Sequence, residues 1–79
     1  MKLNEFFEKR GAESLLAKEM AVSRQTVSLW CLGKNLPNVT NVIKMSKALC
    51  NLGVETTPAE LLKFFNKARE SYQEAEIAF

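Results

Sequence analysis

Hydrophobic positions between residues 16 and 33 are spaced as on two short helices joined by a tight turn. Leu16 and Met20 are one helical step of four apart, and Val27 and Trp30 are one step of three apart. Each pair therefore lies on one helix face. The chain is expected to be organised around one small core, whose members in this segment are Leu16, Met20, Val22, Val27 and Trp30.

The turn is expected to end at Ser23, because a serine hydroxyl accepts hydrogen bonds from the first backbone N–H groups of a helix. The second helix then starts with Arg24, Gln25 and Thr26, none of which the core needs. Arginine and glutamine on the exposed first turn of a helix are suited to base edges in the major groove of DNA. This pattern indicates a DNA-reading helix.

The rest of the pattern predicts an all-α, compact five-helix fold in one domain over residues 1–79. Gly11 suits the end of the first helix, and Asn38 is the expected N-cap of the fourth. Thr57 is expected to cap the fifth helix, with Pro58 at its first position and Glu60 completing a capping box. The predicted helices are Lys2–Arg10, Glu13–Met20, Arg24–Leu32, Val39–Asn51 and a last helix from Pro58. The predicted apolar face of the fourth helix is Val39, Val42, Ile43, Met45, Leu49 and Cys50.

The last predicted helix carries an apolar stripe that starts at Leu61 and steps by four and three to Phe79. A stripe of this period requires a helix partner. Its first half can pack on the core, and residues 66–79 are expected to form an extension used for dimerisation. The alternative is an amphipathic tail folded back on its own domain. The predicted subunit interface consists of Phe65, Ala68, Tyr72, Ala75 and Phe79.

Charge is distributed unevenly, although the net charge is only +2. Residues 20–54 contain Arg24, Lys34, Lys44 and Lys47 but no aspartate or glutamate. A segment without carboxylates can approach phosphate groups without repulsion. The alternative, a solvated mixed surface, would scatter acidic residues through this segment.

Several classes of protein are disfavoured by composition. No apolar run approaches the ~20 residues of a membrane span, and no signal-peptide segment is evident, so a cytoplasmic protein without membrane contact is expected. The chain has no histidine, and Cys31 and Cys50 do not have metal-site spacing, so no metal and no cofactor are expected. Both cysteines fall on apolar stripes and are expected to be small buried side chains. No small-molecule ligand is indicated, and catalysis lacks candidate residues.

The central segment resembles the helix-turn-helix of the phage Cro and lambda-repressor family. That family has an LA pair, a turn ending in V-S, and apolar, aromatic and glycine residues at set distances beyond it. The resemblance extends through Pro37 to the segment 58–62, covering roughly residues 11–65. The matching residues here are Leu16-Ala17, Val22-Ser23, Val27, Trp30 and Gly33.

The resemblance implies base contacts by Arg24, Gln25 and Leu29 and backbone contacts by Ser23, Thr26, Lys34 and Asn35. Leu29 could touch a thymine methyl group or mark a protein-binding face, and the segment of Lys34 and Asn35 could also be an ordinary polar loop. Other candidates come from the residues themselves. Ser28 lies on the outward face of the reading helix, and Asn38 and Asn41 lie at a helix start that favours phosphate. The family usually has glutamine where this chain has Glu13, so either Ser14 or the N–H groups at the start of that helix are expected to make the phosphate contact instead.

These observations favour a homodimeric DNA-binding transcription regulator, a Cro-like repressor of the phage, plasmid or mobile-element kind. Its expected partner is a palindromic operator in double-stranded DNA. The alternative is a protein-binding module on the same fold, an antitoxin or adaptor, with the last helix or Leu29 at the contact.

Overall fold

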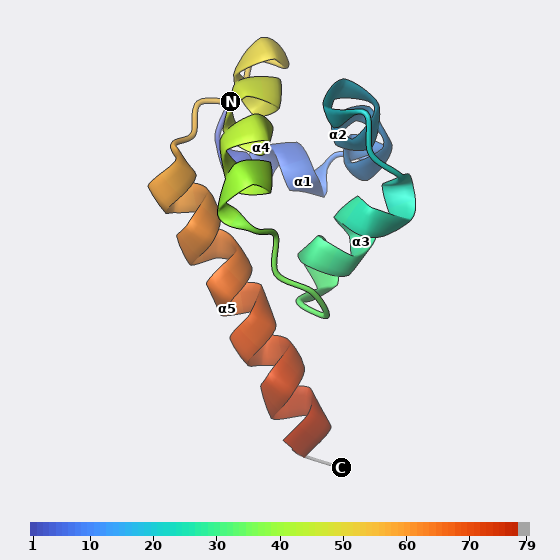
Figure 1. Cartoon of the computed structure of the whole chain (residues 1–79), viewed down its shortest axis with the longest axis vertical. Coiled ribbons are helices and arrows are strands. Elements are labelled where there is room, and N and C mark those ends of the chain that lie inside the picture. The colour runs from blue at the N-terminus through green and yellow to red at the C-terminus, as the bar shows by residue number, and fades with distance from the viewer. Residues whose placement is uncertain (78–79) are drawn as a thin grey trace.

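The computed structural model describes residues 1–77, with side chains described through Ala75. Five helices follow one another in the described part, and no strand is present there, so the predicted all-α five-helix fold is confirmed. Figure 1 shows the first four helices gathered together, with the last running past them as a long rod. The helices are α1 (Leu3–Glu8), α2 (Ala12–Met20), α3 (Arg24–Leu32), α4 (Val39–Asn51) and α5 (Pro58–Ile77).

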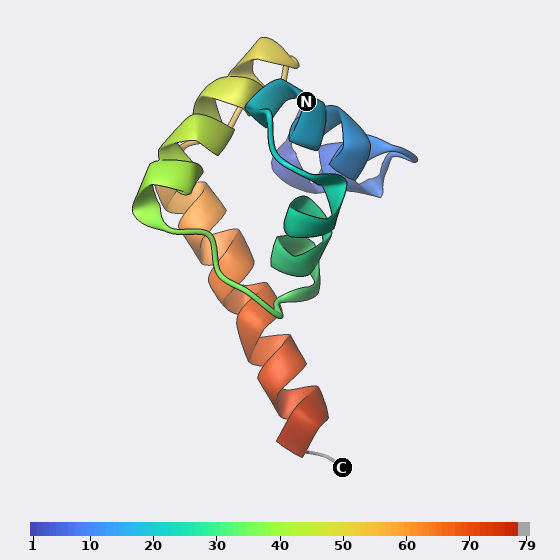
Figure 2. The same ribbon diagram turned by 45° about the vertical axis from the view of Figure 1, so that its right-hand side comes forward.

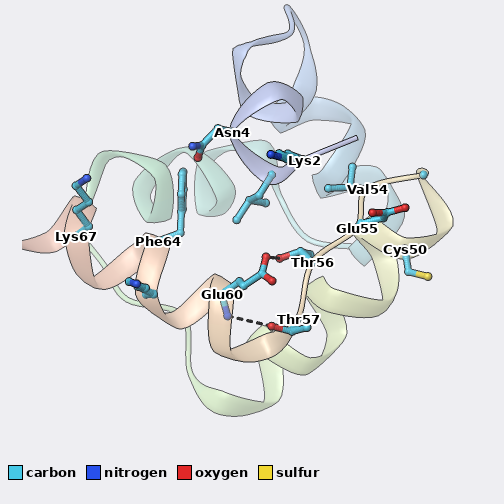
Figure 3. Close-up of a pocket in the computed structure, with 13 residues that line it drawn as sticks. Lys2, Asn4, Cys50, Val54, Glu55, Thr56, Thr57, Glu60, Phe64 and Lys67 are labelled. Atoms are coloured by element: carbon cyan, nitrogen blue, oxygen red, sulfur yellow. Dashed lines mark hydrogen bonds between the residues drawn. The ribbon is translucent and has the colours of Figure 1, made fainter.

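Side-chain caps set the starts of three helices where the sequence predicted them. The backbone N–H of Thr26 donates to Ser23 Oγ at 3.2 Å, and that of Asn41 donates to Asn38 Oδ1 at 2.8 Å. The N–H of Glu60 likewise donates to Thr57 Oγ1 at 3.2 Å (Figure 3). Each bond satisfies a backbone donor that a helix start otherwise leaves unpaired. The predicted capping box is formed only in its first half, because the Glu60 carboxylate accepts from the Thr56 hydroxyl at 3.4 Å instead of from the Thr57 backbone N–H.

The predicted first helix, Lys2–Arg10, was too long at both ends. Lys9 has an extended backbone (φ −73°, ψ 139°) and ends α1 after Glu8. Gly11 has a left-handed backbone (φ 81°) and stands directly before α2, so it begins the second helix rather than ending the first. Residues 9–11 alone separate the two helices, and the turn at Gly11 lets α2 pack against α1.

The core includes Leu16, Val27 and Trp30, while Met20 and Val22 are half-buried against it. The face predicted for α4 was partly wrong. Val39 is 68% exposed and Ile43 44% exposed, and Cys50 is exposed as well. These three lie side by side on α4, about 60–100° around the helix from Val42 at the edge of the buried arc. The buried residues of α4 are Val42, Met45, Ala48 and Leu49.

α5 belongs to the core along its first half only. Leu61 and Phe65 are fully buried against the other helices, whereas the second half extends beyond them (Figures 1 and 2). At its N-terminal end α5 is joined to α1 by aromatic rings, because Phe64 stacks on Phe7 at a centroid distance of 5.3 Å. A helix of 20 residues is about 30 Å long, so α5 spans most of the 40 Å length of the molecule.

Gly33 fixes the end of α3 against the middle of α5. It is buried and has a left-handed backbone with φ of 83°. A Cβ atom at this position would overlap the carbonyl group of Ala68 and lie 2.9 Å from the backbone nitrogen of Arg69. The Arg69 guanidinium also donates to the Lys34 carbonyl oxygen at 2.8 Å. Only glycine allows this approach, because any side chain would collide with backbone atoms, which cannot rotate away.

Substitution of Gly33 by alanine should destabilise the protein far more than the same change at Gly53. Both glycines have a left-handed backbone, which costs a residue with a Cβ about 1–2 kcal/mol. At Gly53 nothing lies within 4 Å of the added atom, whereas at Gly33 it meets α5, which adds overpacking of about 1–3 kcal/mol. Urea unfolding of both variants measures the difference. Equal losses would show that α3 does not depend on this contact.

Candidate nucleic-acid interface

The turn between α2 and α3 is held by backbone bonds and a left-handed residue. Ala21 has φ of 57°, and the Val22 N–H donates to the Ala17 carbonyl at 3.0 Å. The chain thereby turns sharply at the end of α2 (Figure 2) and starts α3 at Arg24. Val27 and Trp30 point into the core, so the opposite face of α3 is turned outward.

The four residues predicted to meet DNA bases occupy this outward face to different extents. Arg24 and Gln25 are exposed, whereas Ser28 and Leu29 are half-buried. The first two are therefore the most prominent side chains at the start of α3, and the second two lie lower on the same surface. Leu32, at the end of the helix, is 62% exposed. Its apolar side chain extends the accessible surface of α3 beyond the four predicted residues.

Ser23 and Thr26, predicted backbone contacts, are bonded to each other. Their hydroxyl oxygens are 2.7 Å apart, and Ser23 also caps the helix. Ser23 is exposed and Thr26 half-buried. A hydroxyl has one donor and two acceptor sites, so this pair can present one O–H outward while the other donates within the pair.

Lys34 and Asn35 follow α3 in a loop that folds back on it. Their backbone N–H groups both donate to the Leu29 carbonyl, at 3.1 and 3.3 Å. Both side chains are exposed beside the end of α3, while Arg69 holds the Lys34 carbonyl from the other side. The loop is therefore fixed at its backbone, and its side chains remain accessible to a ligand.

Asn38 and Asn41 lie at the start of α4, the first exposed and the second half-buried. Because Asn38 Oδ1 accepts the Asn41 N–H, the amide nitrogen of Asn38 is the group that can donate outward. A helix N-terminus attracts anions through its unpaired N–H groups. The cap at Asn38 was predicted from its position before the fourth helix, and both residues stay candidates for contact with a phosphate.

Ser14, at the start of α2, lies close to the first turn of α3. It lines a small hollow of about 190 Å³ together with Arg24, Gly11 and Glu13. The hollow joins the N-terminus of α2 to the first turn of α3. Glu13 carries the only acidic side chain that lines it.

The thiol of Cys31 reaches Glu13, a contact that the sequence did not reveal. Burial raises the pKa of this thiol to about 12, and the charge of Glu13 and a hydrogen bond to its carboxylate contribute to the increase. The contact ties α3 to the start of α2. The expectation that both cysteines are buried was wrong, since Cys31 is half-buried and Cys50 is exposed.

The residues predicted for a subunit interface are divided between two environments. Phe65 is 1% exposed within a single chain, so its assignment to the interface was wrong: the core of the monomer already covers it. Ala68 is half-buried beside Gly33, and Tyr72 is half-buried one turn further on. Ala75 is exposed, and Phe79 lies outside the described residues.

Two helices joined by a short turn, with an outward first turn of the second helix, define a helix-turn-helix. Residues 13–49 match a family model described as Helix-turn-helix. This segment is a helix-turn-helix of the phage Cro and lambda-repressor type, as its sequence indicated, and the protein is a DNA-binding transcription regulator of that type.

Comparison with curated proteins and with solved structures gave no match. Among the residues that the structure describes, no helix is long and apolar enough to cross a membrane.

The two cysteines should differ in reactivity. Thiolates, not thiols, react with alkylating reagents. The raised pKa keeps Cys31 protonated in the folded protein at pH 8, whereas Cys50 is exposed, so iodoacetamide should modify Cys50 alone until the protein is unfolded. Mass spectrometry of the peptides measures this. Modification of both thiols at the same rate in the native protein would contradict the contact between the Cys31 thiol and the Glu13 carboxylate.

Proposed function

We propose that the protein is a homodimeric repressor that binds a palindromic operator, each subunit placing α3 in a major groove. The observation that carries this proposal is the exposure of Arg24 and Gln25 on the first turn of α3. Arginine can bind guanine O6 and N7 as a fork, and glutamine can bind adenine N6 and N7. Neither side chain contributes to the core.

Charge and backbone donors around α3 support the same proposal. The carboxylate-free segment 20–54 contains all of α3, the loop from α3 to α4, and the whole of α4. Lys34 follows the end of α3 and Ser14 lies beside its first turn, so side chains suited to phosphate lie near both ends of this helix. A surface of this kind can follow the DNA backbone on either side of a groove.

The apolar surface of α3 favours a second candidate function. Leu32 is 62% exposed at the end of the helix, close to the half-buried Leu29. An apolar side chain in this position suits a protein partner better than a phosphate backbone. An antitoxin or adaptor that uses the fold to hold another protein would contact this end of α3 or the extended half of α5.

The operator proposal can be tested by selecting bound sequences from a random pool of DNA. A two-fold pair of helix-turn-helix units reads half-sites about one turn of DNA, or roughly 10 base pairs, apart. Recovery of an inverted repeat with that spacing, and sedimentation of the free protein as a dimer, are the expected results. The protein-binding alternative would be favoured if no DNA sequence is enriched and if the affinity of the protein for DNA does not weaken as salt is raised.

Substitution Gln25→Ala should cost about 1–3 kcal/mol at the operator and relax specificity at one base pair. The side chain is uncharged, so binding to random DNA should change little. The matched control is Gln73→Ala, which removes an exposed glutamine from the extended part of α5. Titrations on the operator and on single-base variants measure the effect. An equal loss on every DNA sequence would remove Gln25 from the base-reading set.

Substitution Lys34→Ala should weaken binding to the operator and to random DNA alike. A lysine that contacts a phosphate contributes through released counterions, so the slope of log affinity against log salt should fall by roughly one unit. Lys2→Ala removes the same charge from the far side of the molecule, where Lys2 borders α1 and the α4–α5 loop (Figure 3). If the two variants show the same slope, Lys34 does not lie on the DNA backbone.

A further inference from the structure

Arg69, in the middle of α5, is bonded to the loop that follows α3. Its Nη1 atom donates to the Lys34 carbonyl oxygen at 2.8 Å, where the loop passes beside α5 (Figures 1 and 2). The side chain of Arg69 is half-buried. A hydrogen bond from an ionised donor is shorter and stronger than one between neutral groups. The contact therefore fixes one carbonyl group of the loop to α5.

The backbone of this loop, residues 33–37, is held from two sides. Its first residue packs against α5, and its last is buried. Between them, the N–H groups of Lys34 and Asn35 donate to the Leu29 carbonyl oxygen on α3, at 3.1 and 3.3 Å. The carbonyl of Lys34 accepts instead from Arg69. The peptide groups around Lys34 are thus held between α3 and α5.

The side chains of the loop are accessible although its backbone is fixed. Lys34 and Asn35 are both exposed. A lysine side chain is flexible, so the phosphates it can reach depend on where its backbone is held. A segment that is already ordered also loses less conformational freedom when it binds a ligand, which increases the affinity. Any contact of Lys34 with a phosphate should therefore depend on what keeps the loop in this conformation.

We infer that Arg69 is a positioning residue for DNA binding, which holds the loop in the conformation that presents Lys34 and Asn35 to the DNA backbone; this inference rests on the proposed function. Arg69 lies outside the matched segment 13–49 and within residues 66–79, which were expected to serve dimerisation. The bond to Lys34 gives this part of α5 a second role, because it acts within each subunit on that subunit's own contact with DNA.

A different role for Arg69 would be direct contact with a phosphate. A guanidinium group carries five N–H donors, and the bond to the Lys34 carbonyl uses one of them. The two roles make different predictions. A positioning residue acts through the side chains of Lys34 and Asn35, so its effect on DNA binding disappears when they are removed. A direct contact keeps its effect.

Substitution Arg69→Met removes the donor and keeps an unbranched stem. In the free protein, the N–H protons of Lys34 and Asn35 should exchange with solvent about tenfold faster, because the loop opens more often. Affinity for operator and random DNA should fall about threefold to tenfold, and the slope of log affinity against log salt should fall by roughly one unit. Arg69→Lys should recover most of each loss, because an ammonium group can donate to the same carbonyl.

Nuclear magnetic resonance measures the exchange rates, DNA titrations over a range of salt measure the affinities, and circular dichroism checks that each variant keeps its helices. The matched control is Lys67→Met, which removes the same charge from an exposed residue on the opposite side of α5. It should leave both the exchange rates and the salt slope unchanged. Unchanged exchange of Lys34 and Asn35 in Arg69→Met would overturn the inference.

A double-mutant comparison separates the remaining outcomes. In a protein that already carries Lys34→Ala and Asn35→Ala, Arg69→Met should have little further effect on affinity. An undiminished effect there would show that Arg69 contacts DNA itself, and it would overturn the positioning role while the proposed function stands. If the variant with Lys34→Ala and Asn35→Ala binds DNA as tightly as the wild type, the proposed contact of the loop with phosphate fails, and the inference fails with it.

Discussion

The position of α3 in the fold depends on one close contact. Gly33, at the end of α3, packs against the backbone of α5 at Ala68 and Arg69. α3 is only nine residues long, and a helix of that length is not stable alone in water. Its start is fixed by a serine cap and its end by this contact, with Trp30 and Val27 buried between them. The direction of α3, and with it the place of the side chains proposed to read bases, is thus set at both ends by contacts within the protein.

Local features of the fold could be predicted from the sequence because their causes lie within a few residues. The caps at Ser23, Asn38 and Thr57 bond to N–H groups three residues on, so the residue type and its position suffice. The bounds of α3 and α4 were accordingly correct. Gly11 was misplaced because a left-handed glycine suits both the end of one helix and the start of the next, and spacing alone does not separate these roles.

Features that depend on which helices are neighbours could not be predicted. Periodicity showed that α4 and α5 are amphipathic, but three apolar residues of α4 proved exposed, and Phe65 proved to be part of the monomer's own core. The width of the arc that a helix buries depends on its packing angle, which no local pattern contains. The Cys31–Glu13 contact is of the same kind, since it joins residues of two helices that only the turn between them brings together. The candidate DNA-binding residues were found through their residue types and the family resemblance, whereas their exposure required the structure.

The separation between what holds α3 in place and what α3 presents has a consequence for how DNA specificity can change. Arg24 and Gln25 project from the helix without serving as cap, core or support for another element. Gly33, Val27 and Trp30 have no such freedom. Under the proposed function, mutations at these two positions would alter the DNA sequence that is read at little risk to folding. A regulator built this way can acquire a new set of target sites by a few surface substitutions while its scaffold is inherited unchanged.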